Sequence, residues 1–139
     1  MAEEVKTDKK EKARYYATGK RKTSIARVWV ISGNGKVTVN DKKLEDMYIA
    51  FSSKAKVIRP LILTNTQGRY DVMATVKGGG PQSQSEALMY GIAKVLDGIS
   101  EEYHRILKTE GLLTRDSRIV ERKKYGRKKA RKMTQYRKR

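Results

Sequence analysis

The side chains that could do chemistry in this chain are mostly cations, and phosphate binding is the chemistry they favour. The last 26 residues, 114–139, hold 13 Lys or Arg and two acids, so they carry +11 of the formal charge of +18. Residues 122–139 contain no acid. Like charges at this density repel one another and keep a chain extended until phosphates neutralise them. We therefore expect a tail that becomes ordered on a polyanion.

Two further segments have the residue types for phosphate contact. Residues 18–23 read Thr-Gly-Lys-Arg-Lys-Thr and place three cations on a tight turn between two expected strands, a solvated loop being the alternative. Residues 78–80 are three glycines before an expected helix, whose free N–H groups would attract phosphate. The chain contains neither G-x-x-x-x-G-K-[ST] nor G-x-G-x-x-G. Two interpretations of the glycines therefore stay open, a turn without a ligand and the close approach of a nucleic-acid backbone. Both are favoured over a small-molecule phosphate site.

The sequence offers no credible catalytic or metal-binding set. It has no cysteine, which excludes disulfides, thiolate zinc sites and cysteine nucleophiles. The one histidine, His104, cannot form a metal site alone, and Asp41, Glu45 and Asp46 occupy a helix start, where acids suit the dipole. We expect no enzyme activity, cofactor, metal or small-molecule substrate. The chain also lacks the roughly 18 apolar residues of a membrane span and any signal-peptide pattern, so we expect a soluble, intracellular protein.

The positioning elements can be read from periodicity. Strands are expected in four segments, 15–18, 25–31, 36–39 and 70–77. Asn34-Gly35 between the second and third favours a type I′ turn, which predicts an antiparallel hairpin there. Trp29 and Tyr70 are interpreted as core or strand-face residues rather than as stacking platforms.

Helical spacing predicts the remaining elements. Asn40-Asp41 could cap a helix over residues 44–51, and Pro60 should divide residues 57–63 into two short pieces. A capping box of Ser83 and Glu86 should begin a longer helix. Its buried face would contain Leu88, Ile92, Val95, Leu96 and Ile99. A last helix is expected from Ser100 to Gly111, with Tyr103, Ile106 and Leu107 facing inward.

Strands followed by helices indicate an α+β fold, with helices on one face of a small mixed four-stranded sheet. We expect three parts: a polar, flexible extension over 1–13, a globular RNA-binding domain over 14–113, and the extended basic tail over 114–139. Tails of this composition also occur as DNA-binding segments and nuclear import signals. Tyr125 and Tyr136, interleaved with the cations, favour RNA, because aromatic and guanidinium planes stack on unpaired bases.

Three blocks of sequence resemble one family closely, small-subunit ribosomal protein nine of bacterial type. The first is residues 16–23 continuing into 26–28. The second joins residues 76–80, Val-Lys-Gly-Gly-Gly, to residues 91–93. The third runs from Leu-Thr-Arg-Asp at 113–116 through 121–124 and 129–131 to the final Lys-Arg.

The resemblance implies a structural component of the small ribosomal subunit that binds rRNA in the subunit head beside neighbouring head proteins. It also implies a left-handed βαβ crossover, and a tail that contacts the anticodon stem-loop backbone of peptidyl-site tRNA through Arg139 first and Lys138 second. The residues expected to face rRNA are Lys20, Arg21, Lys22, Arg115, Arg118, Arg122, Lys123, Lys124, Arg127, Lys128, Lys129 and Arg131. Gly78, Gly79 and Gly80 would allow close approach of an RNA backbone. Because small-molecule kinases share this fold, a phosphate-handling enzyme is the alternative.

Overall fold

Alternating buried and exposed side chains build five strands into one mixed sheet. A computed structural model describes residues 14–48 and 51–136. The strands are β1 (Arg14–Arg21), β2 (Ser24–Ser32), β3 (Val37–Val39), β4 (Lys42–Lys43) and β5 (Tyr70–Lys77). Their order in the sheet is β1-β2-β5-β3-β4, and only β3 and β5 run parallel. The α+β class and the mixed sheet are confirmed, but four strands was one too few, because two-residue β4 is too short to show a periodicity.

The hairpin expected at Asn34-Gly35 is wrong. The chain crosses β5 after this turn, so β5 lies between β2 and β3. One carboxylate oxygen of Asp71 accepts the backbone N–H groups of Asn34, Gly35 and Lys36, each at 2.9 Å. These bonds hold the pKa of Asp71 below its ordinary value, and the bond from the Lys36 N–H contributes most. The turn chemistry is satisfied by a distant carboxylate, so it no longer requires a hairpin.

The helices are α1 (Leu44–Met47), α2 (Phe51–Leu63), α3 (Pro81–Ile99) and α4 (Glu101–Thr109). Two boundaries correct the expectation. The chain is extended at Tyr48, so no single helix covers residues 44–51, and α2 continues through Pro60 without a break. Pro60 is fully buried and α2 ends three residues after it, so burial offsets the loss of one backbone hydrogen bond near the helix end.

Helices α3 and α4 begin close to the expected positions but differ in detail. The Ser83–Glu86 capping box is wrong, because Gly80 is the N-cap and Ser83 is already the third helical residue. Ser83 Oγ accepts the N–H of Gly80 at 3.1 Å, which leaves Glu86 free for other contacts. In α4, Leu107 is buried as expected, whereas Ile106 is 39% exposed.

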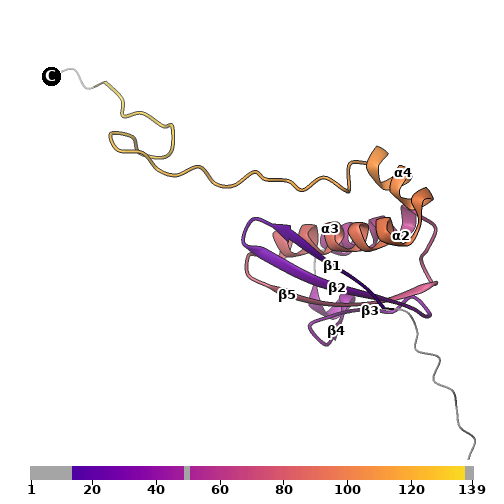
Figure 1. The fold of residues 1–139 in the computed structure, drawn as a ribbon. Coiled ribbons are helices and arrows are strands. Elements are labelled where there is room, and N and C mark those ends of the chain that lie inside the picture. Colours follow the sequence, from indigo (N-terminus) through magenta and orange to yellow (C-terminus); the bar gives the residue numbers. More distant parts are fainter. Residues whose placement is uncertain (1–13, 49–50, 137–139) are drawn as a thin grey trace, which may run out of the picture.

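Helices α2 and α3 cover one face of the sheet, and the core lies between the two layers (Figure 1). Its fully buried side chains include Val28, Val30, Val39, Val57, Leu88, Ile92 and Leu96. The opposite face of the sheet is not covered by any described element (Figure 1). The connection between the parallel strands β3 and β5 contains β4, α1 and α2. Its left-handed crossover remains a prediction.

Helix α3 packs unusually close to β1, and two glycines make this possible. A Cβ atom on Gly19 would lie 2.0 Å from the carbonyl oxygen of Ala87 and 2.5 Å from the backbone nitrogen of Gly91. Both neighbours are backbone atoms and cannot rotate away. Gly19 is the second residue of the expected phosphate-contacting turn, but it lies in β1 and is required for packing.

Candidate nucleic-acid interface

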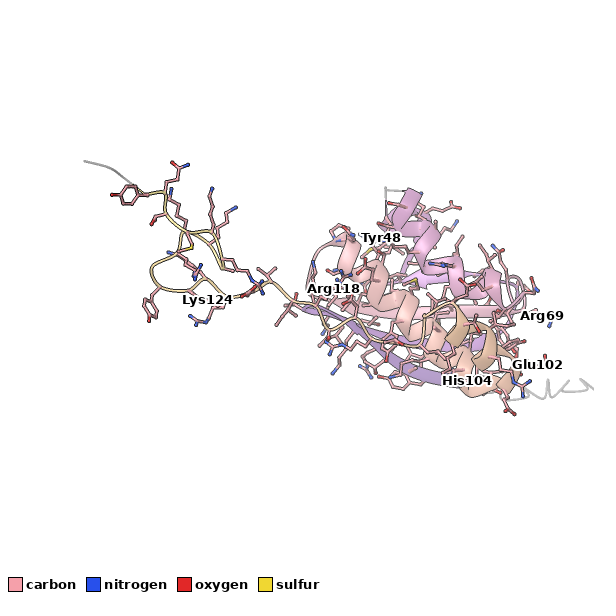
Figure 2. The ribbon with its side chains drawn as sticks, turned by 90° about the horizontal axis from the view of Figure 1, so that it is seen from above. Tyr48, Arg69, Glu102, His104, Arg118 and Lys124 are labelled. Carbon is pink, nitrogen blue, oxygen red and sulfur yellow. The ribbon has the colours of Figure 1, made fainter. Side chains whose placement is uncertain are left out.

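The tail leaves the domain after α4 and extends away from it (Figures 1 and 2). Ile119 and Val120 are 74% and 87% exposed, so neither fills the core. Lys124 lies well outside the domain, whereas Arg118 lies beside it (Figure 2). The cations that the structure describes beyond Arg118 therefore lie on an exposed arm that other molecules can reach.

Residues 121–133 fold back on themselves and form what we call the tail loop. An isolated antiparallel bridge joins Arg127 to Met133, and Glu121 pairs with Lys124 and, at 2.9 Å, with Arg131. Hydrogen bonds from Lys124 and then Arg131 hold the pKa of Glu121 below its ordinary value. The tail is thus not extended throughout, because its second acid supplies a local counter-charge.

The tail cations differ in how much of their donor capacity is already used. Arg122 and Arg127 each donate one hydrogen bond to a backbone carbonyl within the tail. The cations for which the described structure shows no side-chain hydrogen bond are Arg115, Lys123, Lys128, Lys129 and Lys132. Arg139 and Lys138 lie outside the described residues.

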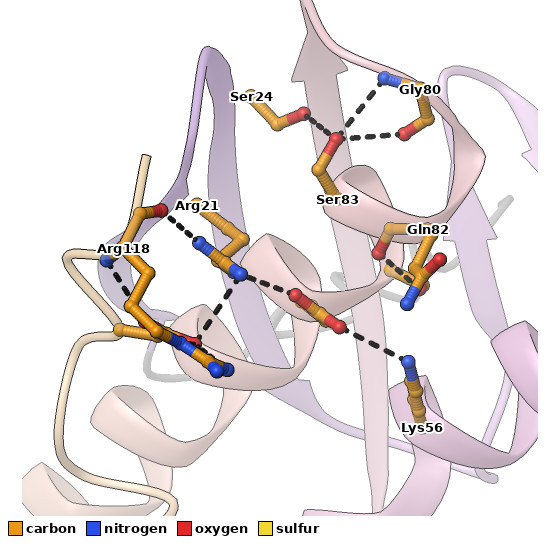
Figure 3. Close-up of polar contacts among 10 residues, drawn as sticks. Arg21, Ser24, Lys56, Gly80, Gln82, Ser83 and Arg118 are labelled. Carbon is orange, nitrogen blue, oxygen red and sulfur yellow. Dashed lines mark hydrogen bonds and ion pairs between the residues drawn. The ribbon is translucent and has the colours of Figure 1, made fainter. Parts of the chain in front are cut away.

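Arg21 binds the first residues of the tail to the domain. Its Nε donates to Glu86 at 2.7 Å and its Nη1 donates to the carbonyl oxygen of Arg118 at 2.7 Å, while Nη2 lies 3.3 Å from Asp116 (Figure 3). Only 11% of the Arg21 side chain is exposed. We call residues 112–118, which include buried Leu112, the tail root. The guanidinium thus bonds to both α3 and the tail root.

The charges around Arg21 balance one another. Glu86 also accepts from Lys56 at 3.1 Å. Burial alone would raise the pKa of Glu86, but hydrogen bonds from Arg21 and Lys56 outweigh it and lower that pKa. Asp116 accepts from the Arg118 side chain, the main reason that its pKa is strongly lowered. Both carboxylates therefore stay charged, which stabilises the guanidinium between them.

The three cations of residues 18–23 separate in space. Because strand side chains alternate, Lys20 points to the uncovered face of the sheet and Arg21 points to the helical layer. Lys22 lies in the β1–β2 turn with a positive φ of 51° and is exposed. Lys20 and Lys22 thus remain available to a partner, whereas Arg21, expected to face RNA, is engaged within the protein.

Backbone geometry explains most of the glycine segment 78–80. Gly78 and Gly79 have φ of 76° and 67°, which other residues adopt only with strain. A Cβ atom on Gly79 would lie 2.1 Å from Ser24 Oγ, within the protein itself. Ser24 Oγ lies 3.0 Å from Ser83 Oγ and fastens this loop to β2 (Figure 3). Only Gly80 faces open space.

One group of residues on β1 and β2 was not predicted as a site. The guanidinium carbon of Arg27 lies 5.1 Å from the ring centre of Trp29 and 5.9 Å from that of Tyr16, and the two rings are 5.4 Å apart. Tyr16 is 51% exposed. Trp29 lies on a strand face, as expected. The alternation of side chains along β1 and β2 could have revealed this group, because it places Tyr16 and Arg27 on the same face as Trp29.

Other chemistry finds no support in the part of the chain that the structure describes. No three His, Cys, Asp or Glu side chains there form a metal-binding group. His104 on α4 pairs with Asp97 and is partly exposed. None of the described helices combines the length and hydropathy that crossing a membrane requires.

An α+β domain with a long, exposed cationic tail and no described catalytic group has the features of a nucleic-acid-binding protein. The family model described as ribosomal protein S9/S16 matches residues 19–139. The small ribosomal subunit protein uS9 of Rickettsia felis is 50% identical over 126 residues, covering 91% of this chain and 78% of the relative. The uS9 protein of Rickettsia prowazekii is 52% identical over 127 residues, covering 91% and 79%.

The chain belongs to the ribosomal protein S9/S16 family. It is a structural, RNA-binding constituent of the small ribosomal subunit, acts in translation in the cytoplasm, and is not an enzyme. The resemblance seen in the sequence is confirmed, and the alternative of a phosphate-handling enzyme is excluded.

Proposed function

We propose that the protein binds rRNA in the head of the small subunit, and that its tail reaches the peptidyl site and contacts the tRNA anticodon stem-loop backbone. The observation that carries this proposal is the tail itself, bound to the domain through Arg21 and otherwise exposed. The 21 residues after Arg118 could span up to about 70 Å if fully extended. A tail of this length can contact groups that lie well away from the domain.

The proposed rRNA contacts are divided between the domain and the tail. Exposed Lys20 and Lys22 act from the domain, together with Gly80, the glycine with open space beside it. Arg118 keeps free donors, since its side chain is 85% exposed although paired with Asp116. The remaining tail contacts are Arg115, Arg122, Lys123, Lys124, Arg127, Lys128, Lys129 and Arg131. Neighbouring head proteins are further proposed partners.

We assign Arg21 a different role from the one expected. Its guanidinium has no room for a phosphate while it bonds to Glu86, Asp116 and the Arg118 carbonyl. It therefore acts as a positioning residue that sets where the tail leaves the domain. Gly78 and Gly79 likewise act by shaping the loop.

The salt dependence of rRNA binding tests the role of the tail. If about eight tail cations displace counterions from non-duplex RNA, log K should fall against log salt with a slope near −5 to −6. A chain lacking residues 122–139 should give a much flatter slope. An unchanged slope would assign the electrostatic contacts to the domain and refute the tail-centred proposal.

The tRNA contact is tested at Arg139, whose planar guanidinium can hold a phosphate through two hydrogen bonds. In purified small subunits, Arg139→Ala should speed tRNA dissociation from the peptidyl site by about 5- to 30-fold at most, as one charge-assisted contact suggests. Arg139→Lys should recover part of the loss. Equal dissociation rates for wild type, Arg139→Ala and a tail-truncated chain would leave only an rRNA role.

A further inference from the structure

The face of the sheet opposite the helices, which we call the open face, carries side chains that the core does not explain. Alternation along β1, β2 and β5 directs one set of residues outward. The strand register arranges them in rows across the sheet. From one end of the sheet to the other, the rows are Lys20–Ile25–Lys77, Thr18–Arg27–Thr75, Tyr16–Trp29–Met73 and Arg14–Ile31–Asp71.

The charge of the open face is strongly one-sided. Four of these twelve residues are cations, and the one acid, Asp71, already accepts three backbone hydrogen bonds. The cations stand in three of the four rows, so a polyanion that follows the strands would meet charge along its length. The outer rows are six residues apart, or about 20 Å.

The middle of the open face is a layered aromatic and cationic cluster. Arg27 lies over both Trp29 and Tyr16 and also donates to the Tyr16 hydroxyl at 3.4 Å. Met73, beside Trp29 in the register, is 42% exposed. A planar aromatic and guanidinium surface of this kind stacks with an unpaired base.

We propose that the open face binds a single-stranded segment of rRNA. A base stacks on the cluster of Tyr16, Arg27 and Trp29, and Lys20 and Lys77 in the adjacent outer row hold phosphates. This inference rests on the proposed rRNA binding and adds a second contact surface, on the face opposite the helical layer. A protein partner fits the face less well, because four of its twelve side chains are cations against one acid. Two of these cations, Lys20 and Lys77, are lysines, a residue type depleted in protein interfaces.

Trp29 makes the open face observable without any mutation, because it is the single tryptophan of the chain. The full-length protein is titrated with a labelled oligoadenylate decamer at fixed salt. Label anisotropy reports all binding, including binding to the tail, and Trp29 fluorescence reports stacking on the open face. We expect saturable quenching of Trp29 over the range in which the decamer binds.

Two matched substitutions assign the signal. Lys77→Gln removes an open-face cation without altering the contacts of Trp29, and should shift the midpoint of the quenching curve by about 5-fold. Lys108→Gln removes an exposed cation on α4 and should shift it by less than about 2-fold. Decamer binding without any change in Trp29 fluorescence would overturn the inference and leave the tail proposal intact. Absence of any binding would refute both.

The assembled subunit provides the second test. A photo-crosslinking amino acid replaces Tyr16, and small subunits that contain the variant are irradiated. A crosslink to rRNA supports the proposal. A crosslink to a protein, either a neighbour or this chain's own N-terminal segment, would overturn it, as would the absence of any crosslink.

Discussion

At the scale of single residues, neighbouring cations in one short motif have different roles. Lys20, Arg21 and Lys22 are adjacent in the sequence, yet only Arg21 is withdrawn from solvent. The difference follows from the strand, which turns alternate side chains to opposite faces. A charged group that is withdrawn in this way needs paired partners, because an unpaired buried charge is costly.

The contribution of Arg21 can be measured by substitution. Arg21→Ala should lower the free energy of unfolding by about 1 to 3 kcal/mol, since it removes charge-assisted hydrogen bonds and leaves Glu86 with Lys56 alone. Lys20→Ala, on the exposed side of the same strand, should change it by less than about 0.5 kcal/mol. Denaturant unfolding of the two variants makes the comparison, and equal effects would contradict the positioning role.

The same site predicts a dependence on pH. Glu86 has a lowered pKa in the folded state, so its stabilising contribution is present above the ordinary value of 4.5 and is lost as pH falls through the lower folded value. The stability gap between wild type and Glu86→Gln should therefore be constant from pH 7 to about 5.5 and narrow below about 4.5. Exposed Glu102→Gln serves as the control, and thermal melts measure the gap. A gap that stays unchanged at low pH would refute the assignment.

At the scale of elements, the close contact between α3 and β1 brings Glu86 within reach of Arg21. The helix approaches the strand so closely because Gly19 and Gly91 face each other. The motif around residue 19 thus joins a packing requirement to the cations of the β1–β2 turn. A side chain at either glycine would move the helix away.

Two glycine substitutions isolate this packing effect. Gly19→Ala should destabilise the domain by about 3 kcal/mol or more, because its Cβ would overlap backbone atoms. Gly98→Ala, in α3 with no atom within 4 Å of its Cβ, should stabilise it by about 0.4 to 1 kcal/mol. Chemical denaturation measures both, and a neutral Gly19→Ala would show that α3 can shift without cost.

At the scale of the whole molecule, the contacts between domain and tail continue past residue 113 to Arg118, the last residue of the tail root. Leu112 is buried, Leu113 packs against the core, and Asp116 and the Arg118 carbonyl bond to Arg21. Beyond Arg118, Ile119 and Val120 are exposed. The contacts of the domain therefore end about five residues later than the expected boundary.

Two truncations test where the folded unit ends. A chain of residues 1–118 should melt at the same temperature as the full chain, because it retains all of the tail root. A chain of residues 1–113 should melt about 5 °C lower or more, since it loses two bonding partners of Arg21. Thermal melts of both truncated chains in one buffer measure the difference. Equal midpoints would show that the folded unit ends at residue 113.

The sequence by itself was sufficient for the α+β class, the long helix α3 and the cationic tail. These depend on composition and on short-range periodicity, which Leu88, Ile92 and Leu96 display within one segment. The family was also recognisable from its motifs. Local patterns failed at Asn34-Gly35, where a favourable hairpin turn was satisfied by Asp71 instead, 36 or more residues away.

Only the tertiary structure decided which cations remain free. Arg21 lies 65 positions before Glu86 and 95 positions before Asp116 in the sequence. No spacing rule links side chains that are so far apart in the chain. The open face was also undetermined, because the register of three strands had to place Tyr16, Arg27 and Trp29 together. Burial and charge pairing are properties of the folded chain. The type of a residue therefore determines what it can bind, and the residues packed around it in the fold determine whether it is free to bind.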